Sequence, residues 1–133
     1  MNRRSRLNRG IRGTRGAALV EMAIVVSLLF LLVFGMIDFG LVLRDYLALS
    51  QLAREGARSA ALSADDVARA RIDTWATNLG LDPNKLIRPV PITRTGNDPG
   101  GQVTVELTYT HNMVTKLFGS TITLKSSMVM RDE

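Results

Sequence analysis

A long apolar segment near the N-terminus constrains this chain more than any other feature. Residues 17–43 contain two charged side chains, Glu21 and Asp38, and the run between these two residues is uncharged. A helix needs about 20 apolar residues to cross roughly 30 Å of hydrocarbon. Along a helix, Glu21 and Asp38 are roughly 25 Å apart. Because backbone groups in lipid must form hydrogen bonds within their own segment, we expect a membrane-spanning helix rather than the buried helix of a soluble protein.

The basic residues are concentrated before this segment. Residues 1–16 contain six arginines and no acid, whereas the rest of the chain has about as many acids as bases, so the net charge of +5 belongs to the leader. The positive-inside rule then places the N-terminus in the cytoplasm and residues 44–133 outside. A basic flank beside a membrane helix sets topology or contacts anionic lipid, so we expect membrane lipid and not nucleic acid as its partner.

The helical pattern continues beyond the membrane segment as a stalk. Apolar residues recur at spacings of three and four up to residue 62, which predicts one buried face. The members of that face are Val42, Tyr46, Leu49, Ala53, Ala57 and Ala60. Small residues around Gly56 would let another backbone approach closely. A second, shorter helix is expected to start with Ser63 as its N-cap and to stop at Gly80.

The final third of the chain changes its period from helix to strand. Apolar and polar residues alternate in 102–110 and in 121–130, which predicts two half-buried antiparallel strands. Prolines allow at best an edge strand around 87–93, and 95–101 reads as a turn. The predicted fold is therefore an α+β membrane protein with a basic leader (1–16), a transmembrane helix (17–43) and an extracytoplasmic α+β domain (44–133). Its small sheet should pack on the second helix and on the stalk.

Few residues are suited to catalysis or metal binding. The absence of cysteine excludes disulfides and thiolate metal sites. His111, the single histidine, is expected to be exposed in a loop at a strand end. Asp65 and Asp66 read as first-turn acids of a helix rather than half a cation site, and the Asn97–Asp98 turn lacks the spaced ligands of a calcium loop. We therefore expect no enzymatic activity, no cofactor and no metal.

The boundary at Gly16 has an unusual order of features. A basic segment is followed by a glycine and then by the hydrophobic helix, with Glu21 at the fifth position after the glycine. An ordinary secretory signal has its hydrophobic core before the cleavage site instead. A glycine before a scissile bond presents no side chain that would obstruct a membrane protease.

This order resembles the class III signal peptides of pilin-like proteins, and more closely the TadE-like family of pseudopilins from tight-adherence (Flp) pilus systems. The resemblance is carried by GAALVEMA at 16–23 and GMIDFG at 35–40, although Met22 stands where the family often has tyrosine. It implies cleavage between Gly16 and Ala17 by a prepilin peptidase, and it makes Glu21 the fifth residue of the mature helix. It also implies a minor pseudopilin of the bacterial inner membrane that takes part in assembly or initiation of a type IVb pilus. Its partners would be other pseudopilins and the pilus secretion machinery.

The two acids of the apolar segment each have alternative roles. A carboxylate within an apolar helix is costly unless it is paired or reaches the interface. Glu21 could bind the freed N-terminus of a neighbouring subunit, or it could be an interfacial acid favoured by the helix dipole. Asp38, the possible second intramembrane acid, could be solvated at the outer interface or pair with a partner. The competing function is a permanently anchored envelope protein whose external domain binds a ligand or the cell wall.

Overall fold

The computed structural model describes residues 9–96, 100–116 and 119–131, with side chains described from residue 16 onward. Its elements are α1 (Arg9–Leu62), α2 (Asp65–Asn78), a 3-10 turn (Pro83–Lys85), β1 (Ile92–Thr95), β2 (Gln102–Asn112) and β3 (Thr121–Arg131). The chain divides into two units, one up to Ile37 and one from Asp38 onward. The long N-terminal helix, the second helix and the small antiparallel sheet agree with the predicted fold class.

The first unit holds the apolar half of α1, and most of its large apolar side chains are exposed. From Leu19 to Ile37 the large apolar residues are between 43% and 72% exposed, except for the half-buried Val26. An apolar window of this helix has a mean hydropathy of 2.7, and none of that window is buried. Because a soluble core helix would be covered by its own chain, the segment has the length and exposure of a helix that can cross a membrane.

The helix begins earlier than the predicted boundary of the leader. It starts at Arg9, so residues 9–16 of the leader are helical as well. Neither Gly13 nor Gly16 interrupts it, although a glycine within a helix costs up to about 1 kcal/mol relative to alanine.

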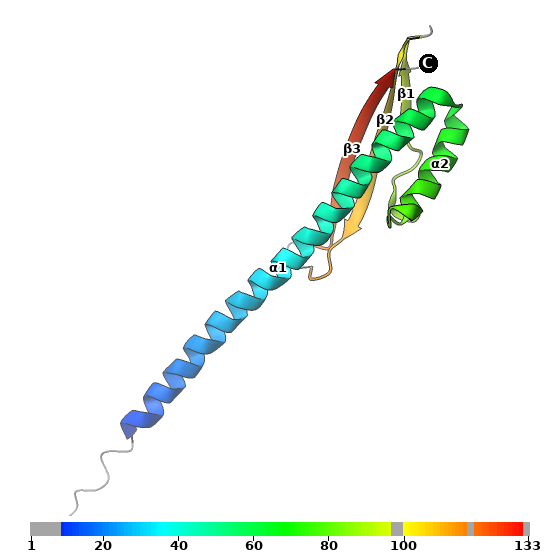
Figure 1. Ribbon diagram of the computed structural model, residues 1–133. Coiled ribbons are helices and arrows are strands. Elements are labelled where there is room, and N and C mark those ends of the chain that lie inside the picture. The colour runs from blue at the N-terminus through cyan, green and yellow to red at the C-terminus, as the bar shows by residue number, and fades with distance from the viewer. Residues whose placement is uncertain (1–8, 97–99, 117–118, 132–133) are drawn as a thin grey trace, which may run out of the picture. The chain divides into compact units, whose positions relative to one another are not determined.

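In the second unit, α1 runs beside α2 (Figure 1), and residues of both helices and of the sheet form one hydrophobic core. Its buried face contains Leu49, Leu52, Ala53, Ala57 and Ala60, all without exposed surface. At Gly56 a Cβ atom would lie 3.0 Å from Ile72 of α2 and 3.5 Å from Val105 of β2. The predicted small-residue face is therefore confirmed as a close-approach surface, and it is covered by the chain's own elements. Tyr46, which we assigned to that face, is instead 46% exposed.

Helix α2 follows the predicted stripe but not the predicted cap. It buries Ala68, Ile72 and Ala76, with Asp65 and Asp66 in its first turn as expected. The N-cap is Ala64, not Ser63, and no side chain caps the helix. At the other end Gly80, at φ 75°, donates to the carbonyl of Thr77, and Leu81 donates to the carbonyl of Ala76. The predicted stop at Gly80 is confirmed, because a left-handed residue ends a helix in this hydrogen-bond pattern.

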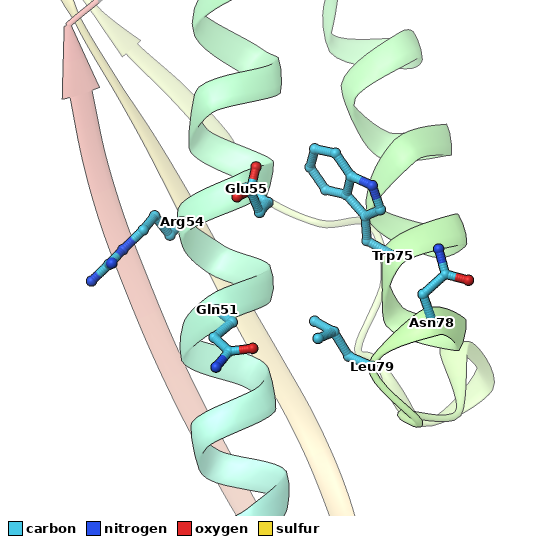
Figure 2. Close-up of a pocket in the computed structure, with 6 residues that line it drawn as sticks. All are labelled: Gln51, Arg54, Glu55, Trp75, Asn78 and Leu79. Carbon is cyan, nitrogen blue, oxygen red and sulfur yellow. The ribbon is translucent and has the colours of Figure 1, made fainter.

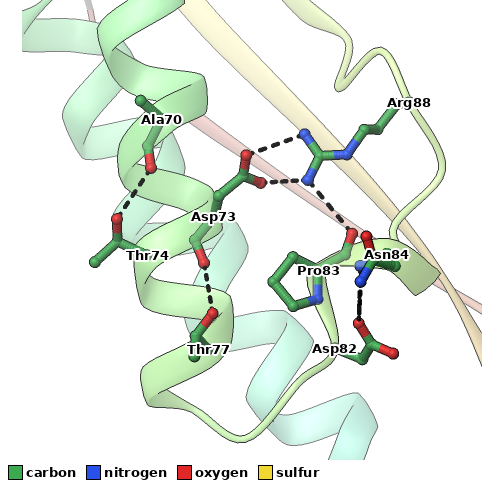
Figure 3. Close-up of polar contacts among 8 residues, drawn as sticks. All are labelled: Ala70, Asp73, Thr74, Thr77, Asp82, Pro83, Asn84 and Arg88. Carbon is green, nitrogen blue, oxygen red and sulfur yellow. Dashed lines mark hydrogen bonds and ion pairs between the residues drawn. The ribbon is translucent and has the colours of Figure 1, made fainter.

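The segment after α2 is attached to that helix by polar contacts (Figure 3). Arg88 forms two hydrogen bonds with the Asp73 carboxylate, at 2.6 and 3.1 Å, and a third with the carbonyl of Pro83. The hydrogen bond to Asp73 raises the pKa of Arg88, so the guanidinium keeps its charge. Arg69 adds a contact to the carbonyl of Val90. These contacts hold the proline-rich stretch before β1 in place.

The three strands form one antiparallel sheet in the order β1-β2-β3. The inner face of β2 buries Val103, Val105, Leu107 and Tyr109, as the alternation predicted, and Leu124 of β3 joins them. The edge strand begins at Ile92, later than the predicted stretch around 87–93, because only an isolated bridge joins Leu86 to Tyr109 upstream. The predicted turn at 95–101 includes residues 97–99, which lie outside the described residues.

Arg94 of β1 closes the C-terminal end of α1. Its guanidinium donates to the carbonyls of Ala60, at 2.7 Å, and Ser63, at 3.2 Å, and it also binds Asp65 at 2.9 Å. The last carbonyls of a helix have no partners within the helix, and they carry partial negative charge. The guanidinium of Arg94 therefore donates hydrogen bonds to carbonyls at the end of α1 and joins this end to the start of α2.

Candidate assembly and membrane-exit sites

The predicted processing site, Gly16–Ala17, lies on an exposed part of α1. A Cβ atom built on Gly16 would meet no atom within 4 Å. Packing within this chain therefore gives no reason for a glycine at this position, although a glycine weakens the helix. That observation is compatible with a requirement imposed from outside the chain, such as access for a protease.

Glu21, the predicted assembly acid, lies one turn further along and is exposed. No hydrogen bond or ion pair to Glu21 is present among the described residues. The carboxylate is therefore available to a group outside the chain, whether that group is a neighbouring subunit or the membrane interface.

Asp38 differs sharply from Glu21, because it is bound by its own chain. Its side chain is 1% exposed. Its Oδ1 atom accepts a hydrogen bond from the backbone N–H of Val114 at 3.0 Å, and its Oδ2 atom accepts one from the N–H of Thr115 at 3.3 Å. The hydroxyl of Thr115 also donates to Oδ2. Asp38 thus collects three donors from a single turn.

The backbone of the turn between β2 and β3 places these donors next to Asp38. It closes through a hydrogen bond from the N–H of Met113 to the carbonyl of Ser120, at 3.0 Å. Lys116 adopts φ 55°, in the left-handed region, and its carbonyl accepts from the N–H of Gly119. The amides of Val114 and Thr115 lie beyond the sheet ladder, which ends at Asn112, so they can bind a carboxylate.

The observed environment of Asp38 differs from both of the environments that we expected for it. We expected either a solvated carboxylate or a contact with a partner, whereas the side chain is buried under residues 114 and 115 of its own chain. An ionised group near hydrocarbon is tolerated when its charge is satisfied by hydrogen bonds. The turn supplies them, so Asp38 joins the end of the apolar helix segment to the sheet.

His111 also differs from its prediction. It lies within β2, is 8% exposed, and its Nδ1 atom lies 2.7 Å from Oδ2 of Asp45 on α1. The prediction that His111 is exposed in a loop is therefore wrong. Two partly buried pairs, Asp38–Thr115 and Asp45–His111, join positions of α1 about two turns apart to the same end of the β2–β3 hairpin.

The second unit also carries an open groove between α1 and α2, with a volume of ≈ 600 Å³. In Figure 2, Trp75 and Leu79 of α2 face Gln51 and Glu55 of α1, whereas Arg54 points away from α2. Its lining brings together no nucleophile and base. Within the part of the chain that the structure describes, no group of three His, Cys, Asp or Glu residues is placed to hold a metal.

These observations define a protein with one candidate membrane-spanning helix and a small α+β domain attached to it. Residues 16–58 match the family model described as TadE-like protein, so the resemblance seen in the sequence is confirmed over that segment. The match covers the apolar helix, Glu21, Asp38 and most of the stalk, and it does not extend to α2 or the sheet. No curated protein and no solved structure matches the chain.

Proposed function

We propose that this chain is a minor pseudopilin that takes part in the assembly or initiation of a tight-adherence (Flp) type IVb pilus. The observation that carries the proposal is the TadE-like match over residues 16–58, which coincides with an apolar helix whose acid Glu21 has no partner among the described residues. The protein would act by association rather than by catalysis.

The proposed sequence of events starts at the cytoplasmic face of the inner membrane. The arginine-rich leader holds Gly16 there, with the external domain on the opposite side. A prepilin peptidase removes the leader, which leaves Ala17 with a positively charged amino group. The carboxylate of Glu21 on one subunit then binds the amino group of its neighbour, because an ion pair offsets the cost of holding either charge in lipid.

The experiment is to compare Glu21→Ala with Glu106→Ala in cells that make the pilus. Glu106 is an exposed acid on the sheet, so its loss controls for a change in net charge. We expect both variants to insert into the membrane and only Glu21→Ala to lose crosslinks to other pseudopilins and surface pili. Unchanged assembly with Glu21→Ala would contradict the proposal.

The groove at Trp75 allows a test of the alternative function, a permanent anchor whose external domain binds the cell wall. Trp75 is the single tryptophan of the chain and lines the groove, so its emission reports on occupancy. Titration with soluble muropeptides should leave the emission unchanged if the protein is a pseudopilin. A saturable shift, together with an intact leader in native membranes, would favour the anchored protein instead.

A further inference from the structure

The β2–β3 turn lies against α1 where the uncharged run of the helix ends. Asp38 follows Ile37, the last residue of that run, and binds the amides of Val114 and Thr115. Figure 1 shows the turn beside α1 at one end of the sheet. Asp38 belongs to α1 and binds the turn. The turn is therefore attached to α1 at the residue where the apolar segment ends and the external domain begins.

The rise of an α-helix per residue gives the depth at which Asp38 would lie in a bilayer. A hydrocarbon layer of about 30 Å takes about 20 helical residues. If Glu21 lies at the cytoplasmic boundary, the outer boundary falls near residue 41, about one turn beyond Asp38. Asp38 and the turn that covers it are then at the outer edge of the hydrocarbon, not in bulk water.

The turn presents side chains that suit this environment. Val114 is 67% exposed, although apolar, and Lys116 is exposed beside it. A lysine at a membrane boundary extends its ammonium toward the headgroups while its methylene chain contacts apolar groups.

The residues of α1 that follow Asp38 include exposed apolar and aromatic side chains as well. Tyr46, about two helical turns beyond Asp38, is 46% exposed, and Phe39 and Leu43 are exposed as well. Tyrosine is enriched where hydrocarbon meets headgroups. An exposed aromatic ring on α1 and an exposed valine and lysine on the turn therefore accompany the end of the apolar run.

We infer that the β2–β3 turn is a second membrane contact, in which Val114 enters the interface and the Lys116 ammonium binds lipid phosphate in the external leaflet. Asp38 holds the turn in position for this contact. The domain would then be attached to the bilayer at two points, the helix and the turn, which restricts its tilting. The inference requires α1 to span a bilayer and is independent of the pilus role.

The absence of cysteine makes the test direct. The full chain, reconstituted in phosphatidylethanolamine–phosphatidylglycerol vesicles, carries a nitroxide at a single introduced cysteine. The test site is Val114→Cys, the control is Val129→Cys on β3, which is 50% exposed, and the reference is Leu28→Cys in the apolar run. Collisions with oxygen, which concentrates in lipid, are compared with collisions with a water-soluble nickel chelate.

We expect oxygen to dominate at positions 28 and 114 and the nickel chelate to dominate at position 129. If the label at position 114 behaves like the label at 129 while position 28 reports lipid, the turn does not contact the membrane and the inference is wrong. Nickel dominance at position 28 would overturn the spanning helix itself, which separates the two failures.

The headgroup contact is tested in the same background with Lys116→Gln and with Lys125→Gln, an exposed lysine on β3, as the control. Phosphatidylglycerol should increase the oxygen preference at position 114 relative to phosphatidylcholine alone, because anionic lipid attracts the lysine. We expect Lys116→Gln to lose this increase and Lys125→Gln to keep it. An increase that survives Lys116→Gln would exclude Lys116 as the phosphate ligand.

Discussion

The carboxylate of Asp38 accepts a hydrogen bond from the backbone N–H of Val114 at 3.0 Å, across 76 positions of the sequence. The contact ties the end of the apolar helix run to the turn that joins the two long strands. Glu21, the other acid of the segment, makes no hydrogen bond or ion pair among the described residues. One acid therefore has a role within the fold, and the other remains available to a partner.

The first prediction concerns this difference between the two acids. Asp38→Ala leaves two amides and a hydroxyl of the turn without their acceptor, and an unsatisfied buried donor is unfavourable. We expect exchange of the Val114 and Thr115 amides in detergent micelles to accelerate by roughly one to two orders of magnitude. Glu21→Ala should leave the same amides unchanged. Equal exchange in Asp38→Ala and the wild type would show that the carboxylate does not hold the turn.

The contacts of Asp38 also show where sequence reasoning stops. The C-terminal end of α1, the buried face of β2 and the stop at Gly80 depend on local periodicity and backbone conformation, so they could be predicted. The partners of Asp38 and Asp45 lie on the β2–β3 hairpin, and no local pattern identifies a contact between such distant positions.

The cap of α2 was missed for a different reason. Ser63 has the residue type of an N-cap, but its carbonyl binds Arg94, and the helix starts after Ala64. A long-range contact thus overrides a local preference. Similarly, His111 was predicted to be exposed because no partner is near it in the sequence, whereas the fold places Asp45 beside it.

The second prediction tests the close packing at Gly56. A Cβ atom at this position would already lie 3.0 Å from the Ile72 side chain, so the larger side chain of Gly56→Val must push Ile72 out of its place in the core. We expect a loss of about 1–3 kcal/mol in the free energy of unfolding of the external domain, followed in urea by the emission of Trp75. Gly40→Val is the matched control, because a Cβ at Gly40 meets no atom within 4 Å. A similar stability for both variants would argue against the packing described.

The third prediction concerns Arg94, which binds the end of α1. Arg94→Ala removes hydrogen bonds to the carbonyls of Ala60 and Ser63 and an ion pair whose side chains are 33% and 36% exposed. Allowing for solvent screening, we expect the domain to lose about 1–2 kcal/mol of unfolding free energy. Arg88→Ala should cost less than about 1 kcal/mol, because its pair with Asp73 is more exposed. The reverse order in urea denaturation would show that Arg94 does not close the helix.

The fourth prediction separates a processing role of Gly16 from a structural one. Gly16 and Gly40 are both helical, and at both positions a Cβ atom would enter open space, so the fold should accept leucine at either one. We expect Gly16→Leu to block removal of the leader in cells with an active prepilin peptidase and Gly40→Leu to permit it. Electrophoretic mobility of the membrane-bound protein distinguishes the two forms. Normal processing of Gly16→Leu would remove the proposed reason for a glycine there.

The central claim is that the chain is a processed pseudopilin, and it is tested most directly by the intact mass and N-terminal sequence of the protein from its native membranes. We expect a chain that begins at Ala17, with Glu21 as its fifth residue. A chain that begins at Met1 or Asn2 in cells with an active prepilin peptidase would contradict the account and favour a permanently anchored envelope protein.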